Sequence, residues 1–171
     1  MNENSLNNTD NITVYHGGTE KIDSPICKFG RKNLDFGKGF YLTTLREQAE
    51  TWANNMARSR NKPAIINQYS LNRAAIIKEA RCKIFKAYDE EWLQFIVGNR
   101  TGLNLAEDYD YIEGGVANDR VIDTINLYLA GLIEFSSALK ELSKHQPNNQ
   151  ICILNQDLID KHLTFNGTEQ L

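Results

Sequence analysis

Apolar side chains recur every three to four residues after Thr44, a spacing typical of an amphipathic helix. The apolar face consists of Leu45, Ala49, Trp52, Ala53 and Met56. Thr44 and Glu47 have the spacing of a capping box at the start of this helix, and Pro63 ends the segment. We expect Trp52 to be a core anchor, the alternative being a ligand-stacking role.

Further helices and several short strands follow from the same signals. Asp89 and Asn118 are placed as N-caps of two helices, and a last helix begins near Phe135 and ends at Pro147. The expected strands are 12–15, 40–42, 64–71, 82–85, 109–116, 150–154 and 163–165. Because strands and helices mix without regular β-α-β alternation, the predicted fold class is α+β.

Length and composition are those of one ordinary globular domain. The chain has 171 residues, of which 41% are hydrophobic and 24% charged. A domain of this size buries roughly 70% of the surface of its unfolded chain, so it needs no disulfide or metal for stability. We expect a flexible polar tail over residues 1–11 and a single domain over 12–171.

The charge distribution favours a small anionic ligand over a long nucleic acid. The net charge is −3, yet the segment from Glu20 to Lys62 contains nine Lys or Arg residues and only five Asp or Glu residues. A protein that binds nucleic acid without sequence preference is usually strongly basic overall. Scattered solvated charges are an equally simple interpretation of this segment.

Common catalytic and targeting motifs are missing from the sequence. The three cysteines are far apart and form no C-x-x-C motif, which predicts neither a disulfide framework nor a zinc site and favours the reducing cytoplasm. His16, His145 and His162 lack the spacing of a helical metal site, and no P-loop or G-x-S-x-G elbow occurs. Neither a signal peptide nor a membrane span is expected, so we predict a cytoplasmic protein without metal.

Three short segments could carry chemistry together. They are Val14–Gly17, with a histidine before glycine at a strand end; Asp35–Thr44, where glycines lead into an aromatic strand; and Asn148–Ile153, where a polar side chain starts an apolar strand. Each segment alone is a weak signal, since a histidine beside glycine or a Phe-Tyr strand is more often structural.

In this order the three segments resemble the ADP-ribosyltransferase superfamily. The resemblance is to its branch with a His-Tyr-Glu signature, shared by diphtheria-type toxins and the poly(ADP-ribose) polymerases, and is nearest to a bacterial domain family of unknown function placed there. It extends over about residues 12–166 and includes Glu91–Leu93 and Tyr109–Arg120. It implies two small, strongly bent sheets with flanking helices that clamp NAD between them.

The resemblance implies roles for individual residues. His16 would bind an adenosine-ribose hydroxyl, Gly17 would bring its backbone to the nicotinamide amide, and Tyr41 would stack on the nicotinamide ring, while Phe40 would face the core. The basic loop before Tyr41, which also contains Lys28 and Lys32, would cover the pyrophosphate. The implied NAD-binding set is His16, Gly17, Arg31, Lys38, Gly39, Tyr41 and Thr43.

The sequence departs from the signature at its third position, where Gln150 stands in place of the usual Glu. A glutamine can still orient a ribose through hydrogen bonds, but it carries no charge and is no base. Asp119 is our candidate for the missing charge, its alternative role being a favourable charge at a helix N-terminus. Glu113 is a weaker candidate, and Asp35 is expected to anchor the loop before Tyr41.

By resemblance, we expect an NAD-dependent mono-ADP-ribosyltransferase with His16, Tyr41, Gln150 and Asp119 in its catalytic centre. It would break the nicotinamide–ribose bond and transfer ADP-ribose to a protein or nucleic-acid acceptor. The habit of the family suggests a bacterial toxin, paired with an antitoxin or serving in phage defence. A non-catalytic NAD or ADP-ribose binding module is the alternative, because of Gln150; an RNA 2′-phosphate transferase using His145 ranks last.

Overall fold

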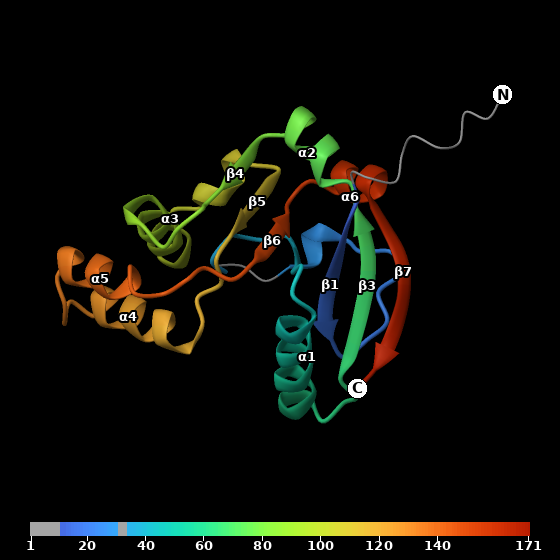
Figure 1. The fold of residues 1–171 in the computed structure, drawn as a ribbon, viewed down its shortest axis with the longest axis horizontal. Helices are drawn as coiled ribbons and strands as arrows, with labels where there is room; N and C mark the ends of the chain where they lie inside the picture. The colour runs from blue at the N-terminus through green and yellow to red at the C-terminus, as the bar shows by residue number, and fades with distance from the viewer. Residues whose placement is uncertain (1–10, 31–33) are drawn as a thin grey trace.

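A computed structural model describes residues 11–30 and 34–171 of the chain, and Figure 1 shows its elements. In chain order they are β1 (Ile12–Gly18), η1 (Cys27–Phe29), β2 (Phe40–Leu42), α1 (Arg46–Arg60), β3 (Ile65–Leu71), α2 (Arg73–Glu79), β4 (Cys82–Ile84), α3 (Glu90–Arg100), η2 (Leu105–Asp108), β5 (Tyr111–Gly114), α4 (Asp119–Leu129), α5 (Phe135–Leu142), β6 (Gln150–Ile153), α6 (Gln156–His162) and β7 (Leu163–Gln170). The predicted tail over 1–11 lies almost entirely outside the described residues.

Two small sheets form the framework, which confirms the predicted α+β class. Sheet A has the strand order β1-β3-β7 and is antiparallel. Sheet B has the order β2-β6-β5-β4, in which β4 and β5 are parallel and the other pairs antiparallel. Tyr15 of β1 and Thr43, just after β2, exchange backbone hydrogen bonds of 2.8 and 2.9 Å and so join the two sheets.

Each face of sheet B packs against a different core. One core contains residues of both sheets, among them Phe40, Leu42 and Tyr111. The other lies beneath α3, α4 and α5, and Tyr41 and Cys152 pack in it. Because successive side chains of a strand point to opposite faces, Phe40 and Tyr41 belong to different cores. Phe40 is buried, as predicted.

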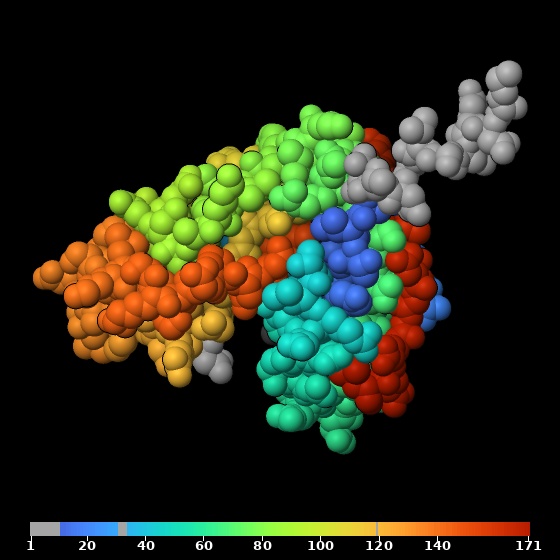
Figure 2. Space-filling view, in the orientation of Figure 1, coloured from blue at the N-terminus to red at the C-terminus, as the bar shows by residue number. Residues whose placement is uncertain are grey.

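Helix α1 packs on sheet A, apart from the helices that cover sheet B. Ala49 and Ala53 bury against Ala64 and Ile66, with Tyr15 at the margin. Figure 2 shows the molecule hollowed between α1 and the side that carries α4 and α5. The helices on the two sides of this hollow therefore pack on different sheets.

Two predicted helix starts are confirmed and one is wrong. Asp89 and Asn118 cap α3 and α4, accepting bonds from the backbone nitrogens of Trp92 (3.0 Å) and Val121 (3.2 Å). The capping box of Thr44 and Glu47 is not formed: the N-cap of α1 is Leu45, without a side-chain cap. Instead, Thr43 Oγ1 accepts the Leu45 N–H.

Candidate functional site

The His16 ring is held by a backbone carbonyl. Its Nδ1 lies 2.8 Å from the Tyr41 oxygen, and the ring stacks on Phe40 with a centroid distance of 4.7 Å. Since a carbonyl oxygen only accepts, Nδ1 must carry the proton. Burial lowers the pKa of His16, which favours the neutral ring. The Nε2 atom of that tautomer is an acceptor for a hydroxyl.

Gly17 belongs to β1, an edge strand of sheet A, and packs directly against helix α1. A Cβ at this position would stand 1.9 Å from the Ala49 carbonyl oxygen, so the close packing of α1 requires glycine. This packing, rather than the approach of a ligand, explains the absence of a side chain. Tyr15 turns its N–H and C=O toward Thr43, and by strand alternation Gly17 presents both groups on the same edge.

Tyr41 is fixed through its hydroxyl. That hydroxyl donates to the Gly37 oxygen at 2.6 Å and accepts the Phe36 N–H at 3.2 Å. Burial raises the pKa of the phenol far above its ordinary value. The hydroxyl therefore serves the loop before β2, and the ring is the part of Tyr41 that remains for binding.

Gln150 carries an amide without a partner. The residue is 7% exposed, and its Nε2 is buried with no hydrogen bond in the described structure. Cys152 pairs with Tyr41, so Gln150, two residues earlier on β6, points to the same face of sheet B as the Tyr41 ring. A buried unpaired amide costs about 1–3 kcal/mol, and such an exception calls for a ligand or another functional reason.

Asn149 binds the start of β6 to the corner between β2 and α1. Its backbone oxygen accepts bonds from Thr43 Oγ1 (2.8 Å) and Gln48 Nε2 (2.6 Å). Its side-chain Oδ1 accepts the Thr44 N–H at 3.0 Å, and its Nδ2 donates to Glu113 Oε1 at 3.2 Å. Asn149 lies within the segment Asn148–Ile153 singled out in the sequence, but no role was predicted for it, because its partners lie far away in the chain.

Trp52 is half-buried and belongs to none of the three apolar clusters of the described residues, so its predicted role as a core anchor is wrong. It lies four residues after Gln48 and thus on the same side of α1. Gln48 binds Asn149, so this side faces β6. The half-buried indole therefore lies on the side of α1 that faces β6.

The structure brings some of the predicted residues together. His16 contacts Tyr41, and Tyr41 shares a sheet face with Gln150. The His16 ring, however, stacks on Phe40 and so lies on the other face of sheet B, and no contact among the described residues joins it to Gln150.

The other predicted NAD contacts have structural partners or lie elsewhere. Thr43 is fully buried and bonded to Asn149, and Gly39 is buried against Cys152, where a Cβ would stand 2.5 Å from the sulfur. Lys38 is exposed and precedes β2, at the end of the strand opposite Thr43. Arg31 lies outside the described residues, as does the side chain of Asp119, whose backbone starts α4.

Glu113 and Asp35, the two other carboxylates named in the sequence analysis, already accept hydrogen bonds from neighbouring side chains. Glu113 accepts hydrogen bonds from Arg73 Nε (2.7 Å), Tyr111 (2.8 Å) and Asn149. Asp35 accepts from Arg100 Nε at 2.7 Å, which confirms its predicted role as an anchor of the loop before Tyr41.

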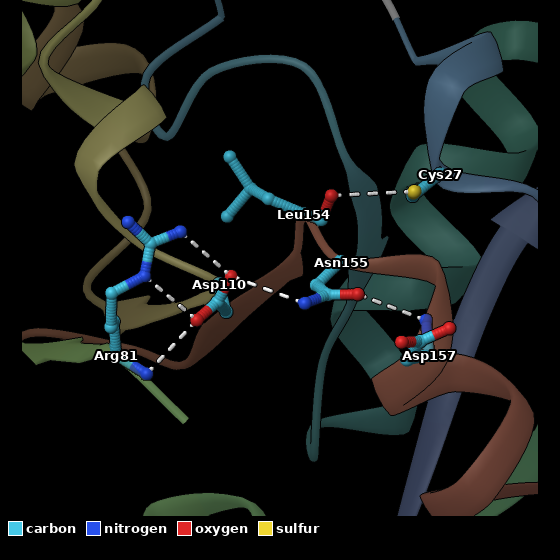
Figure 3. Close-up of polar contacts among 6 residues, drawn as sticks. All are labelled: Cys27, Arg81, Asp110, Leu154, Asn155 and Asp157. Carbon is cyan, nitrogen blue, oxygen red and sulfur yellow. Dashed lines mark hydrogen bonds and ion pairs between the residues drawn. The ribbon is translucent and has the colours of Figure 1, made fainter. Parts of the chain in front are cut away.

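A separate cavity lies at the other end of sheet B. A cavity of about 610 Å³ is bordered by Lys38, Arg81, Asp110 and Asn155, among others. Figure 3 shows Asp110 receiving bonds from Arg81 and Asn155. These bonds lower the pKa of Asp110 to about 2. The Asp110 carboxylate is thus satisfied within the protein.

Two kinds of site receive no support from the described residues. No three His, Cys, Asp or Glu side chains gather there in a way that could hold a metal ion. None of the helices described is long and apolar enough to cross a bilayer.

Comparison with known proteins identifies a family. A family model described as "Protein of unknown function (DUF3990)" matches residues 12–165, most of the chain. No curated protein and no solved structure matches significantly.

Proposed function

The chain belongs to the DUF3990 family of proteins of unknown function, and from the geometry of its hollow we propose that it is an NAD-dependent mono-ADP-ribosyltransferase. The proposal places it in the ADP-ribosyltransferase superfamily, with His16, Tyr41 and Gln150 at the positions of the His-Tyr-Glu signature.

The unpaired Gln150 amide carries the proposal. Its nitrogen is buried on the Tyr41 face of sheet B, and no group of the described protein uses its hydrogens. A ribose hydroxyl is an acceptor that would satisfy it. The same amide would then fix the sugar while positive charge develops there, although without the charge of a glutamate.

Strand β1 of sheet A supplies complementary groups for the rest of the dinucleotide. The neutral His16 ring offers Nε2 as an acceptor for the second ribose. The open edge at Gly17 offers one N–H and one C=O, the pair that a carboxamide such as that of nicotinamide requires.

Two aromatic residues suit the cationic nicotinamide ring. The hydrogen bond from the Tyr41 hydroxyl to the Gly37 oxygen fixes the orientation of the Tyr41 ring. Trp52 provides an indole from α1. An aromatic face attracts a cation most strongly where water is excluded. Both rings would lose this attraction once the bond breaks and nicotinamide becomes neutral, which favours its departure.

NAD supplies the ADP-ribosyl group: the bond from C1′ to the nicotinamide nitrogen breaks, its electron pair leaves with nicotinamide, and the acceptor forms the new bond to C1′ and loses its proton to water. Gln150 orients the ribose but accepts no proton from the acceptor. Transfer of a single unit, rather than chain elongation, fits this site. A role as an intracellular bacterial toxin, held in check by an antitoxin or used against phage, belongs to the same proposal.

A non-catalytic NAD or ADP-ribose binding module is the second candidate, and the same amide favours it. A neutral Gln150 can hold the sugar equally well without promoting bond cleavage. The two candidates share the binding site and differ only in turnover.

The test is release of nicotinamide from labelled NAD, with a bacterial lysate as the source of acceptors. Release by the wild-type protein that is lost in His16→Ala, Tyr41→Leu and Gln150→Ala supports the transferase. Asn166→Ala, an exposed change on β7, is the matched control and should keep full activity. Saturable binding of NAD without release would support the module, and absence of binding would overturn both.

A further inference from the structure

A triad of an asparagine, a carboxylate and an arginine lies at each end of strand β6. The carboxylates are Glu113 of β5 and Asp110, which directly precedes β5. Before β6, Asn149 Nδ2 donates to Glu113 (3.2 Å), and Glu113 accepts from Arg73 Nε (2.7 Å). After β6, Asn155 Nδ2 donates to Asp110 (3.2 Å), and Asp110 accepts from Arg81 at 3.0 Å through both Nε and Nη2. Figure 3 shows the second of these triads.

Only the first triad adjoins the proposed site. Asn149 precedes Gln150 directly and also binds Thr43, Thr44 and Gln48, at the start of α1. It therefore joins the strand that carries Gln150 to the helix that carries Trp52. Its side chain and backbone oxygen thus add a second link between the two sheets, beside the backbone bonds of Tyr15 and Thr43.

Glu113 determines how the Asn149 amide is turned. An ionised carboxylate only accepts hydrogen bonds, so the NH₂ end of Asn149 must face Glu113. The oxygen end is then left for the Thr44 N–H. Without the carboxylate, the amide could rotate or swing away, and Thr44 would lose its partner.

We propose that Glu113 is a positioning residue, which acts through Asn149 to fix Gln150 and the start of α1 relative to each other. Glu113 does not supply the charge that Gln150 lacks, because its two oxygens are already used by Arg73, Tyr111 and Asn149. The consequence for turnover rests on the proposed transferase function; the positioning itself does not.

The decisive variants exchange acid and amide. Glu113→Gln offers one acceptor oxygen to three donors, and Asn149→Asp sets two carboxylates against each other. In the double variant Glu113→Gln/Asn149→Asp, the amide now at position 113 can donate to the carboxylate now at position 149, which still accepts from Thr44. We therefore expect each single change to disrupt the pair and the double change to restore it, a non-additive result.

The matched control is Asp110→Asn in the second triad. Both carboxylates have side-chain exposures of 15%, and each is bound to one arginine and one asparagine. The control removes an equivalent charge from the opposite end of β6. Its effect on stability should be similar, whereas its effect on the site should be absent.

The first readout needs no activity. Hydrogen exchange of the Thr44 backbone amide, followed by NMR, should accelerate at least about tenfold in Glu113→Gln and in Asn149→Asp, return toward the wild-type rate in the double variant, and stay unchanged in Asp110→Asn. Equal acceleration in Glu113→Gln and Asp110→Asn would overturn the proposal, as would a double variant no better than the worse single one.

The second readout is kcat and KM for nicotinamide release. A misplaced Gln150 should lower kcat about tenfold or more, with a smaller change in KM, and the double variant should recover most of it. Unchanged kcat in Glu113→Gln would overturn the catalytic consequence. If the wild-type protein neither binds NAD nor releases nicotinamide, the proposed function fails, while Thr44 exchange still decides the positioning role.

Discussion

The His16 imidazole donates from Nδ1 to the backbone oxygen of Tyr41 over 2.8 Å. This bond links a side chain of sheet A to the main chain of sheet B. It also selects the tautomer in which Nε2 faces away from Tyr41 as an acceptor. Both the stability of the protein and the proposed binding of NAD depend on this one ring.

His16→Asn should separate these two functions. An asparagine can keep a donor near the position of Nδ1 but places no acceptor where Nε2 stands, so folding should survive and NAD binding should weaken at least about tenfold. Isothermal titration with NAD measures the loss. Wild-type affinity in a folded His16→Asn variant would contradict the assigned role.

The same variant should change the dependence of stability on pH. Burial lowers the pKa of His16 in the folded state, so on acidification the unfolded chain binds the proton more readily. The free energy of unfolding should therefore fall as the pH drops below about 6.5, the ordinary histidine value. Urea denaturation between about pH 7.5 and pH 5 should show a shallower fall in His16→Asn than in the wild-type protein.

Gln150→Met should stabilise the protein while removing its proposed activity. Methionine has similar length and no polar hydrogen, so the cost of the buried unpaired Nε2 disappears. We expect a gain of about 1 kcal/mol in the free energy of unfolding, measured with urea, and loss of nicotinamide release. A loss of stability would mean that the amide has a partner within the protein.

Gly17→Ala and Gly18→Ala should have opposite consequences. A Cβ on Gly17 would meet the Ala49 oxygen at 1.9 Å, and the displacement of α1 should cost about 1–3 kcal/mol. A Cβ on Gly18 would be 3.4 Å from His16 Nε2, a tolerable contact that leaves the fold intact but crowds the acceptor. Thermal unfolding should show a loss of stability in Gly17→Ala only, and NAD titration should show weaker binding in Gly18→Ala although its fold is intact.

Tyr41→Phe should affect stability more than NAD binding. The lost hydroxyl leaves the Gly37 oxygen and the Phe36 N–H without their partner, which should cost about 1–2 kcal/mol. The ring remains, so the affinity for NAD should stay within about threefold of the wild type. Tyr41→Leu is the comparison, because it removes the aromatic face as well.

Trp52 should report directly on occupancy of the hollow. NAD should quench its fluorescence, and the quenching should vanish in Trp52→Phe, which leaves only the fully buried Trp92. Because Trp52 lies outside the apolar clusters, this change should cost about 1 kcal/mol or less of stability. Quenching that persists in the variant would place the nucleotide elsewhere.

Local signals in the sequence predicted much of the fold. Periodicity located α1, capping residues located α3 and α4, and alternation separated Phe40 from Tyr41. The short helices α2 and α6 escaped notice, although Asn72 and Asn155 cap them, because seven residues give little periodicity. Trp52 was misplaced because periodicity shows which side of a helix is apolar but not how far the opposing sheet extends.

The site was less predictable, since its main connections are made between distant segments. The bonds of Asn149 reach Thr44 and Glu113, and their existence depends on how the two sheets meet. The tie between His16 and the Tyr41 carbonyl involves a backbone group, which leaves no trace in residue type. Resemblance to a family indicated which residues to examine; only the folded chain shows what each is bonded to.

The isolation of the Gln150 side chain has an evolutionary consequence. Its neighbours hold the strand, and its own nitrogen supports nothing in the scaffold. Selection can therefore exchange this amide for an acid, a single nucleotide step in either direction, without rebuilding what surrounds it. Lineages could gain or lose catalytic strength at this one codon while the architecture stays constant.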